Sequence, residues 1–227
     1  MMEKNGGTAR TMKYELVIFD LDGTLLNTLD DLTDATNRAL RDKGFPERTS
    51  EEVRRFIGNG AARLIQRALP ASADDDLRRE TLAGFKRYYS RDINVKTQPY
   101  PGIIALLSAL TGAGVRVAVN SNKPDSATQA LCRAHFDGMI ALALGEREGI
   151  PKKPAPDGAR RIMEALGVPA AATLYVGDGD TDLETARNAG IDSAWVSWGF
   201  RRRDELHGLA VPLAFDTADA LAEYILK

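Results

Sequence analysis

YELVIFDLDGTLLN, residues 14–27, contains the features from which the rest of the fold follows. Its apolar run, residues 16–19, is rich in branched and aromatic side chains, which is typical of a strand buried on both faces. The run stops at Asp20, and a second carboxylate, Asp22, follows before a glycine and Thr24. Two acids that leave a buried strand cost free energy to desolvate unless a cation or protons accompany them. A strand that ends in an Asp-rich turn is the alternative interpretation of this stretch alone.

The composition is that of a folded globular chain. Of the 227 residues, 44% are hydrophobic and 27% are charged, which suffices for one large domain or for a domain with a smaller insert. The formal net charge of −2 provides no basic field, so we expect no nucleic-acid partner. No apolar run approaches the roughly 20 residues that cross a bilayer, so we expect no membrane segment. The single cysteine, Cys132, excludes an intrachain disulfide and favours a cytoplasmic protein.

The segment from residue 28 to about residue 95 shows only helical patterns. Apolar residues recur at helical spacing from Leu29 onward, and Thr49 and Glu52 can form a capping box at the start of a further helix. After residue 100 the pattern alternates between helices over 103–110, 124–136, 156–166, 181–189 and 217–226 and strands over 115–119, 139–144, 174–176 and 194–197. Repeated units of strand and helix predict a parallel sheet with helices on both faces.

The sequence therefore predicts an α/β protein with two parts. Residues 13–27 and 96–227 are expected to form a Rossmann-like core with a parallel sheet. Residues 28–95 interrupt this series after its first strand, so we expect them to form a small inserted α-helical cap domain. Residues 1–12 are interpreted as a flexible N-terminal segment.

Polar side chains follow four of the predicted strands, those over 16–19, 115–119, 139–144 and 174–176. In a parallel sheet the carboxyl ends of the strands meet at one edge, where ligands collect. The side chains expected at this edge are Asp20, Asp22 and Thr24, Asn120 to Lys123, Lys152 and Lys153, and Asp178, Asp180 and Asp182. Each group also has an ordinary interpretation, as a helix cap, a solvated lysine or an Asx-turn. Taken together they predict a charged pocket that suits Mg²⁺, a cation that prefers oxygen ligands.

Four short motifs in order resemble the haloacid dehalogenase-like phosphatase superfamily: DLDGTL at 20–25, NSNKP at 120–124, KKPAPD at 152–157 and GDGDTD at 177–182. The resemblance extends from about Tyr14 to Trp198, and the helical insert is similar to the helical cap of that family. The stretches FIGNGAARLIQRAL at 56–69 and YPGIIALLSAL at 100–110 look like phosphoglycolate phosphatases. The resemblance implies a Mg²⁺-dependent phosphatase that acts on a small phosphorylated metabolite, with 2-phosphoglycolate as the leading substrate.

The resemblance also implies roles for the acids. Asp20 would be the nucleophile that forms an aspartyl-phosphate, and Asp22 would protonate the leaving group and later deprotonate the attacking water. Mg²⁺ would be held by Asp20, by the backbone carbonyl of Asp22 and by Asp178. Asp182 would orient a metal-bound water or Lys153. The dehalogenases of the superfamily lack an acid at the position of Asp22, so its presence favours phosphoryl chemistry.

The remaining site residues follow from the second and third motifs and from the first turn. Ser121 and the backbone near Asn122 would bind phosphoryl oxygens, and Lys153 would balance the negative charge at the reacting centre. Lys152 is the competing lysine, but the spacing within KPxP favours Lys153. Thr24 is expected to bond the backbone of the turn, close to the nucleophile and the phosphate.

The cap is expected to close over the site and to contact the leaving group. Gly58 and Gly60 allow close approach of the backbone to a small substrate. Arg63 and Arg67, one helical turn apart, would meet a substrate carboxylate, with a solvated cationic helix face as the alternative. Residues 201–203, three arginines, are interpreted as a surface charge run.

Other functions remain open from the sequence. A phosphosugar mutase or a nucleotide or pyrophosphate hydrolase would keep the same motifs, and a catalytically idle binding protein could keep the same fold. The complete set of Asp20, Asp22, Ser121, Lys153 and Asp178 favours an active phosphatase. The chain is expected to be a monomer or a homodimer.

Overall fold

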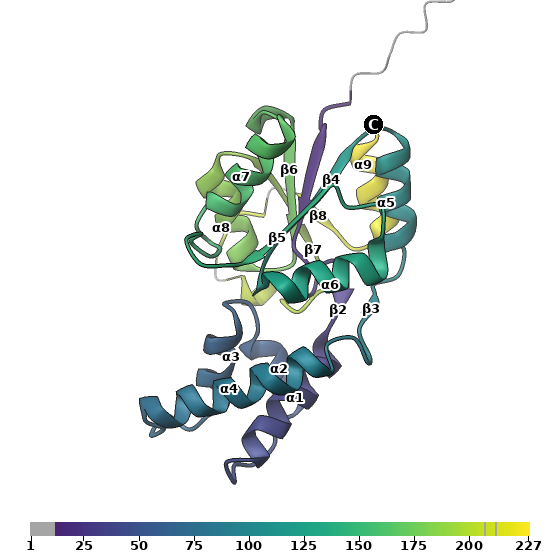
Figure 1. Cartoon of the computed structure of the whole chain (residues 1–227). Coiled ribbons are helices and arrows are strands. Elements are labelled where there is room, and N and C mark those ends of the chain that lie inside the picture. The colour runs from purple at the N-terminus through teal and green to yellow at the C-terminus, as the bar shows by residue number, and fades with distance from the viewer. Residues whose placement is uncertain (1–11, 207, 212) are drawn as a thin grey trace, which may run out of the picture.

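The computed structural model describes residues 12–206, 208–211 and 213–227, so the predicted flexible segment lies outside it except for Met12. A six-stranded sheet forms the centre of the larger of two units (Figure 1). All its strand pairs are parallel, in the order β5 (Leu142–Glu146), β4 (Arg116–Pro124), β1 (Leu16–Phe19), β6 (Thr173–Gly177), β7 (Asp192–Val196) and β8 (Ala214–Phe215). The prediction of an α/β fold with a parallel sheet is confirmed.

The strand β1 lies in the middle of this sheet and is completely buried. Its side chains alternate between the two faces, as the pleat of a strand requires. Val17 and Phe19 belong to one hydrophobic cluster, and Leu16 and Ile18 belong to another on the opposite face. The apolar run has no polar alternation because both faces of the strand are covered.

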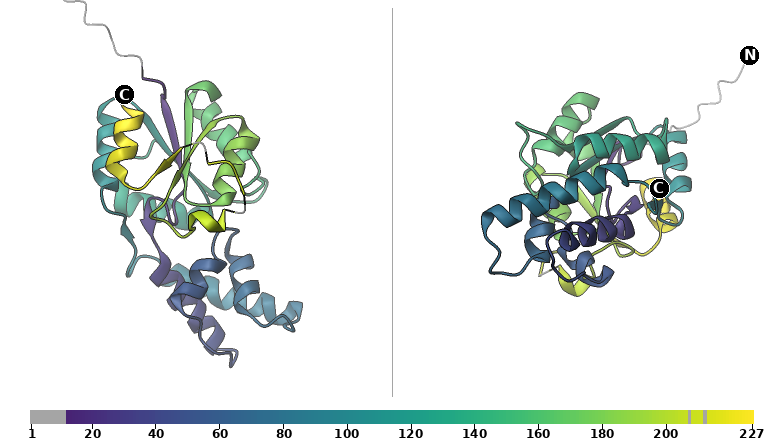
Figure 2. Two further views of the ribbon diagram at one scale, coloured as in Figure 1. Left: turned by 180° about the vertical axis from the view of Figure 1, so that it is seen from behind. Right: turned by 60° about the horizontal axis from the view of Figure 1, so that its bottom comes forward.

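Helices cover both faces of the sheet (Figure 2). The cluster around Val17 and Phe19 includes side chains from α5 (Ile103–Gly112), α6 (Asp125–Phe136) and α9 (Ala218–Ile225). The cluster around Leu16 and Ile18 includes side chains from α7 (Asp157–Leu166) and α8 (Asp180–Ala189). Among the described helices, none combines the length and the apolar character that a membrane crossing requires.

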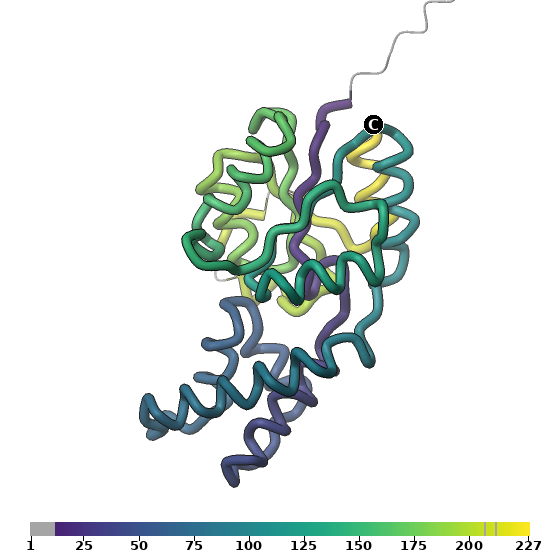
Figure 3. Tube along the Cα trace, in the orientation of Figure 1, coloured from purple at the N-terminus to yellow at the C-terminus, as the bar shows by residue number. Residues whose placement is uncertain are grey.

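The smaller unit consists of four helices around a core of their own: α1 (Leu29–Arg41), α2 (Ser50–Phe56), α3 (Ala61–Ala68) and α4 (Asp75–Arg91). The capping box of Thr49 and Glu52 is present at the start of α2. The chain passes between the units in two adjacent segments, β2 (Leu26–Asn27) and β3 (Gln98–Pro99), which pair as a short antiparallel ribbon (Figure 3). The predicted cap boundaries, residues 28 and 95, lie just inside this ribbon.

Two strand predictions need correction, and three short strands were missed. The strand predicted at 115–119 continues as β4 to Pro124, because NSNKP stays extended although its register with β5 shifts after Asn120. The strand predicted at 139–144 begins only at Leu142 and continues to Glu146. The short strands β2, β3 and β8 were not predicted, since two residues carry no recognisable periodicity.

Candidate active site

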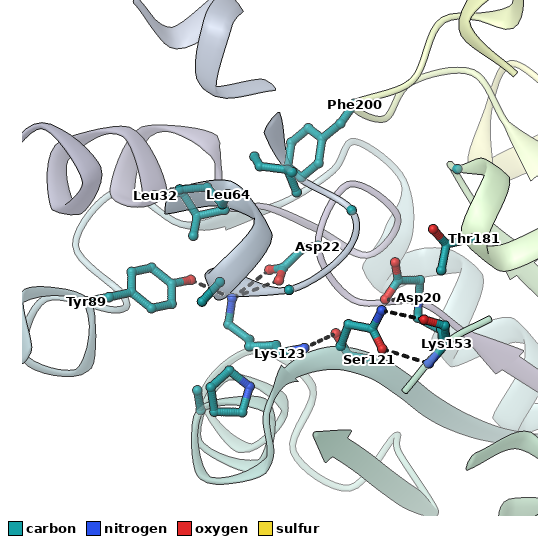
Figure 4. Close-up of a pocket in the computed structure, with 18 of the residues that line it drawn as sticks. Asp20, Asp22, Leu32, Leu64, Tyr89, Ser121, Lys123, Lys153, Thr181 and Phe200 are labelled. Carbon is teal, nitrogen blue, oxygen red and sulfur yellow. Dashed lines mark hydrogen bonds and ion pairs between the residues drawn. The ribbon is translucent and has the colours of Figure 1, made fainter. Parts of the chain in front are cut away.

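A cavity of about 460 Å³ lies between the carboxyl edge of the sheet and the cap (Figure 4). The register of the sheet explains why charged residues gather there, because Phe19 pairs with both Val119 and Val176, and the polar residues that follow these three positions therefore begin at the same level of the sheet. The sheet contributes the polar lining, which includes Asp20, Asp22, Ser121, Lys123, Lys153 and Asp178. The cap contributes a mostly apolar lining, which includes Leu32, Ile57, Leu64, Phe85, Tyr89 and Ile93.

Lys153 is the buried cation beside the predicted nucleophile. Its Nζ lies 2.9 Å from Asp20 Oδ1 and 2.7 Å from Asp182 Oδ1, and 3% of its side chain is exposed. Burial opposes the charge of this ammonium group, but Asp182 and Asp20 hold its pKa well above the ordinary value. Lys152 has 42% of its side chain exposed and pairs with Glu146 at 2.6 Å. The structure therefore brings Lys153, and not Lys152, to the two acids.

Three carboxylates form an acidic cluster next to Lys153. Asp20, Asp178 and Asp182 each place one oxygen within 4.8 Å of the others. Burial raises the pKa of Asp20 to about 8, with Lys153 opposing and the charges of Asp182 and Asp178 adding to the rise. Burial and the charge of Asp182 raise the pKa of Asp178 to about 7. One lysine is too little positive charge to keep this cluster ionised near neutral pH, so the cluster fits a divalent cation with oxygen ligands.

Asp178 is held by three hydrogen-bond donors. The Phe200 N–H donates to its Oδ2 at 2.7 Å, Thr24 Oγ1 donates to its Oδ1 at 3.2 Å, and Trp195 Nε1 donates to its carbonyl oxygen at 2.8 Å. The prediction that the Thr24 side chain bonds the backbone of the turn is therefore wrong, because its buried hydroxyl bonds a carboxylate, and its contact with the phosphate stays a prediction. Gly23 is required beside this group, since a Cβ there would lie 2.6 Å from Asp178 Oδ2.

Asp22 is paired with a second buried lysine, Lys123, which the sequence placed at this edge of the sheet without giving it a role. Lys123 Nζ donates to Asp22 Oδ1 at 2.8 Å and to Oδ2 at 2.9 Å, and it also bonds the hydroxyl of Tyr89 on the cap (Figure 4). Thr28 Oγ1 donates to Asp22 Oδ1 at 2.9 Å. Burial raises the pKa of Tyr89 to about 12, so the phenol stays protonated. The available signal was the position of Lys123 in NSNKP, directly after Ser121 and Asn122.

Ser121 and Asn122 both line the cavity but do different things. Ser121 Oγ accepts a hydrogen bond from the Lys123 N–H at 3.3 Å. The side chain of Asn122 accepts from the Lys153 N–H at 2.9 Å and donates to the Lys153 carbonyl at 3.1 Å. The Asn122 side chain thus fixes the loop that carries Lys153, which leaves its backbone as the part assigned to the phosphate.

Of the predicted cap residues, Gly58 and Gly60 lie at the cavity and the two arginines do not line it. Gly60 lines the cavity, whereas Arg63 and Arg67 are not among the lining residues. Arg63 donates to Gln66, and Arg67 donates to the carbonyl oxygen of Phe56, so both lie on the exposed face of α3, as the alternative of a solvated cationic helix face predicts. The reason is helical spacing, since α3 turns its apolar residues toward the cavity and its arginines away. Contact of either arginine with a substrate carboxylate stays a prediction.

The arginine run is also not a simple surface feature. Arg201 lines the cavity, and 13% of its side chain is exposed. Its guanidinium donates to the carbonyl oxygens of Arg54 and Ile57, at the end of α2 in the cap. The prediction of a surface charge run is therefore wrong for this residue, because the run begins directly beside Asp178.

Of the two later acids of the last motif, Asp182 belongs to the acidic cluster and Asp180 does not. Asp182 Oδ2 accepts from the Gly179 N–H at 3.1 Å, while its Oδ1 binds Lys153. Asp182 is 3% exposed. Asp180 lies 3.9 Å from Arg201 and has 38% of its side chain exposed, so it stands apart from the acidic cluster.

Comparison with known proteins agrees with this geometry. Residues 17–196 match the family model of haloacid dehalogenase-like hydrolases. The phosphoglycolate phosphatase of Rhodospirillum rubrum is 35% identical over 217 residues, which cover 92% of this chain and 90% of that protein. A crystal structure from Lactobacillus delbrueckii subsp. bulgaricus, provisionally assigned as a phosphoglycolate phosphatase, is 37% identical with a TM-score of 0.91, covering 94% of this chain and 99% of that one. The chain therefore belongs to the haloacid dehalogenase-like hydrolases and resembles their phosphoglycolate phosphatases.

Proposed function

We propose that this protein hydrolyses a small phosphate monoester with Mg²⁺ through an aspartyl-phosphate on Asp20, and that 2-phosphoglycolate is its substrate. The observation that carries the proposal is Lys153 Nζ, held 2.9 Å from Asp20 and 2.7 Å from Asp182 at the floor of the cavity. This arrangement orients Asp20 and supplies positive charge where a phosphoryl group would arrive. The substrate assignment rests on the relatives, which are named phosphoglycolate phosphatases.

The reaction would proceed in two displacements at phosphorus. A carboxylate oxygen of Asp20 forms a bond to phosphorus while the bond to the leaving oxygen breaks, and Asp22 donates a proton to that oxygen. A water molecule then attacks the same phosphorus, Asp22 takes its proton, and the bond to Asp20 breaks to release phosphate. The Thr28 and Lys123 contacts hold Asp22 in place for both transfers.

Mg²⁺ supplies charge that offsets the repulsion between the phosphoryl group and the carboxylates. Asp20, Asp178 and the backbone carbonyl of Asp22 would hold the ion, and Asp182 would keep Lys153 in position. Ser121 and the backbone near Asn122 would bind phosphoryl oxygens. We further propose a cytoplasmic location, a monomer or homodimer, and no nucleic-acid partner.

A second class of substrate is favoured by the cap side of the cavity. Leu32, Leu64 and Phe85 present an apolar surface to the space above Asp20, and the cavity of about 460 Å³ exceeds the size of a glycolate group. Burying apolar surface of a leaving group there would contribute about 0.8 kcal/mol for each CH₂ group. Monoesters with a larger apolar leaving group are therefore the second candidate.

Release of inorganic phosphate from a panel of compounds tests these proposals. The panel contains 2-phosphoglycolate, ethyl phosphate, benzyl phosphate, glucose 1-phosphate and pyrophosphate, each with Mg²⁺ and with a chelator. We expect Mg²⁺-dependent release with the highest kcat/KM for 2-phosphoglycolate. A preference for benzyl over ethyl phosphate by more than about tenfold would identify the apolar class instead. Isomerisation of glucose 1-phosphate without phosphate release would identify a mutase, and no turnover of any compound would favour an idle binding protein.

A further inference from the structure

Arg54 is a buried cation of the cap that none of the four motifs contains. It lies on α2, is 8% exposed, and directs its guanidinium out of the cap toward the core. Its two Nη atoms bond both carboxylate oxygens of Glu205 at 2.9 Å each, and Nη1 also bonds the carbonyl oxygen of Phe200. Its Nε and Nη2 bond Glu51 on the same helix at 2.8 and 3.0 Å. These five hydrogen bonds use all five donors of an arginine side chain.

Phe200, whose carbonyl oxygen accepts a hydrogen bond from Arg54, also contacts Asp178 of the acidic cluster. Phe200 accepts from Arg54 through its carbonyl oxygen, and its own N–H donates to Asp178 Oδ2 at 2.7 Å. The preceding residue, Gly199, has no space for a side chain, since a Cβ there would lie 2.2 Å from Asp178 Cβ and 2.4 Å from the carbonyl oxygen of Gly23. The backbone at 199–200 therefore packs directly against Asp178, and a shift of this backbone would change the contacts of the Asp178 carboxylate.

A second arginine connects the two units in the opposite direction, from the core to the cap. Arg201, on the core, donates to the carbonyl oxygens of Arg54 and Ile57 on the cap. One guanidinium group thus reaches from the cap to the core and the other from the core to the cap. If the cap moved away from the core, both sets of bonds would break, and the carbonyl oxygen of Phe200 would lose its bond from Arg54.

We propose that Arg54 is a positioning residue that couples docking of the cap to the geometry of the Asp178 carboxylate, through the backbone of Phe200. The proposal rests on the proposed function, in which Asp178 binds Mg²⁺. Because coupling between two equilibria is reciprocal, a docked cap would strengthen Mg²⁺ binding, and bound Mg²⁺ would favour the docked cap. The cap would then assist the site even before a substrate enters it.

Calorimetric titration of Mg²⁺ into the substrate-free protein tests this proposal without relying on turnover. We expect R54M to raise the Mg²⁺ dissociation constant about fivefold or more, within the usual range of coupling between sites. The matched control is R55M, because Arg55 is the next residue on α2 and its exposed guanidinium pairs with Glu51. Thermal unfolding of each variant checks that it folds, and E205Q, which removes the charge that receives Arg54, replaces R54M if that variant does not fold.

Two results separate the coupling from the metal assignment. A folded R54M or E205Q that binds Mg²⁺ as tightly as R55M overturns the coupling, provided that D178N has lost Mg²⁺ binding. If D178N itself binds Mg²⁺ with unchanged affinity, the assignment of Asp178 in the proposed function fails and the coupling fails with it. Weaker binding in R54M and E205Q, with R55M unchanged, supports the coupling.

Discussion

Two buried lysines lie among four acids at the floor of the cavity. Lys123 bridges Asp22 and the cap, and Lys153 bridges Asp20 and Asp182. Buried ion pairs of this kind cost about as much in desolvation as they return in attraction, so they are weak evidence for a role in stability. Their value lies in holding charged groups in fixed positions before a substrate arrives, which is where proteins gain most in phosphoryl transfer.

Replacing the lysine beside Asp20 should impair turnover specifically. We expect K153M to lower kcat/KM for 2-phosphoglycolate by about 10²- to 10³-fold, because it removes the positive charge next to the reacting centre. The matched control is K152M, since Lys152 is the adjacent residue, is largely exposed and pairs with Glu146. Steady-state kinetics of both variants checks the prediction. Equal loss in the two variants would mean that the geometry at Asp20 does not identify the motif lysine.

At the scale of elements, the cap has a hydrophobic core separate from those of the sheet. Leu40 of α1, Val53 of α2 and Ile65 of α3 are almost completely buried in this cluster. Neither the short helix α2 nor α3 would persist alone, because helices of fewer than about 12 residues are marginal in water. Packing against α1 and α4 therefore maintains the surface that the cap presents to the cavity.

Removing volume from this core should destabilise the protein. We expect L40A to lower the free energy of unfolding by about 2–5 kcal/mol, because the deleted side chain is completely buried and leaves a cavity. V95A serves as the control, since Val95 is 67% exposed. Urea unfolding followed by circular dichroism measures both changes. A change of similar size in the two variants would contradict the description of the cap core.

The elements were largely predictable because each carries its own periodicity. The fully apolar run of β1, the capping box of Thr49 and Glu52, and the helical spacing after Leu29 each identify one element. The extent of β4 was not predictable, because Ser121 and Lys123 continue as a strand although their polarity suggests a loop. The orientation of Arg63 and Arg67 depends on how α3 packs, which local spacing alone does not reveal.

At the scale of the whole molecule, the contact between cap and core depends on pairs far apart in sequence. Arg54 with Glu205, and Tyr89 with Lys123, join the two units on either side of the cavity. Arg54, Glu205 and Tyr89 belong to none of the four motifs, and although Lys123 lies in NSNKP, only the folded chain identifies the partner of each residue. The catalytic motifs were predictable from their order and spacing, whereas the residues that connect the cap to the core were not.

The contact between Arg54 and Glu205 should make stability depend on pH. Hydrogen bonds from Arg54 lower the pKa of Glu205 to about 2, below its ordinary value near 4.5. An acid whose pKa is lower in the folded state than in the unfolded state stabilises the fold above its pKa in the unfolded state. This stabilisation is lost as pH falls through its pKa in the folded state. We expect E205Q to lower the free energy of unfolding by about 1–3 kcal/mol at pH 7, with the difference shrinking between about pH 4.5 and pH 2.

Urea unfolding of the unmodified chain and E205Q at pH 7, pH 4 and pH 3 measures this dependence. The glutamine variant has no titration at that position, so the difference between the two proteins isolates the carboxylate. A difference that stays constant or widens as pH falls would contradict the assignment.

The proposed mechanism depends on Asp20 as the residue that receives the phosphoryl group. The most direct measurement is the rate of phosphate release from 2-phosphoglycolate with Mg²⁺, compared between the unmodified chain and D20N, with thermal unfolding as the check on folding. We predict that D20N loses at least about 10³-fold in kcat while remaining folded, because an amide cannot form the acyl phosphate. Near-normal turnover by a folded D20N variant would contradict the account.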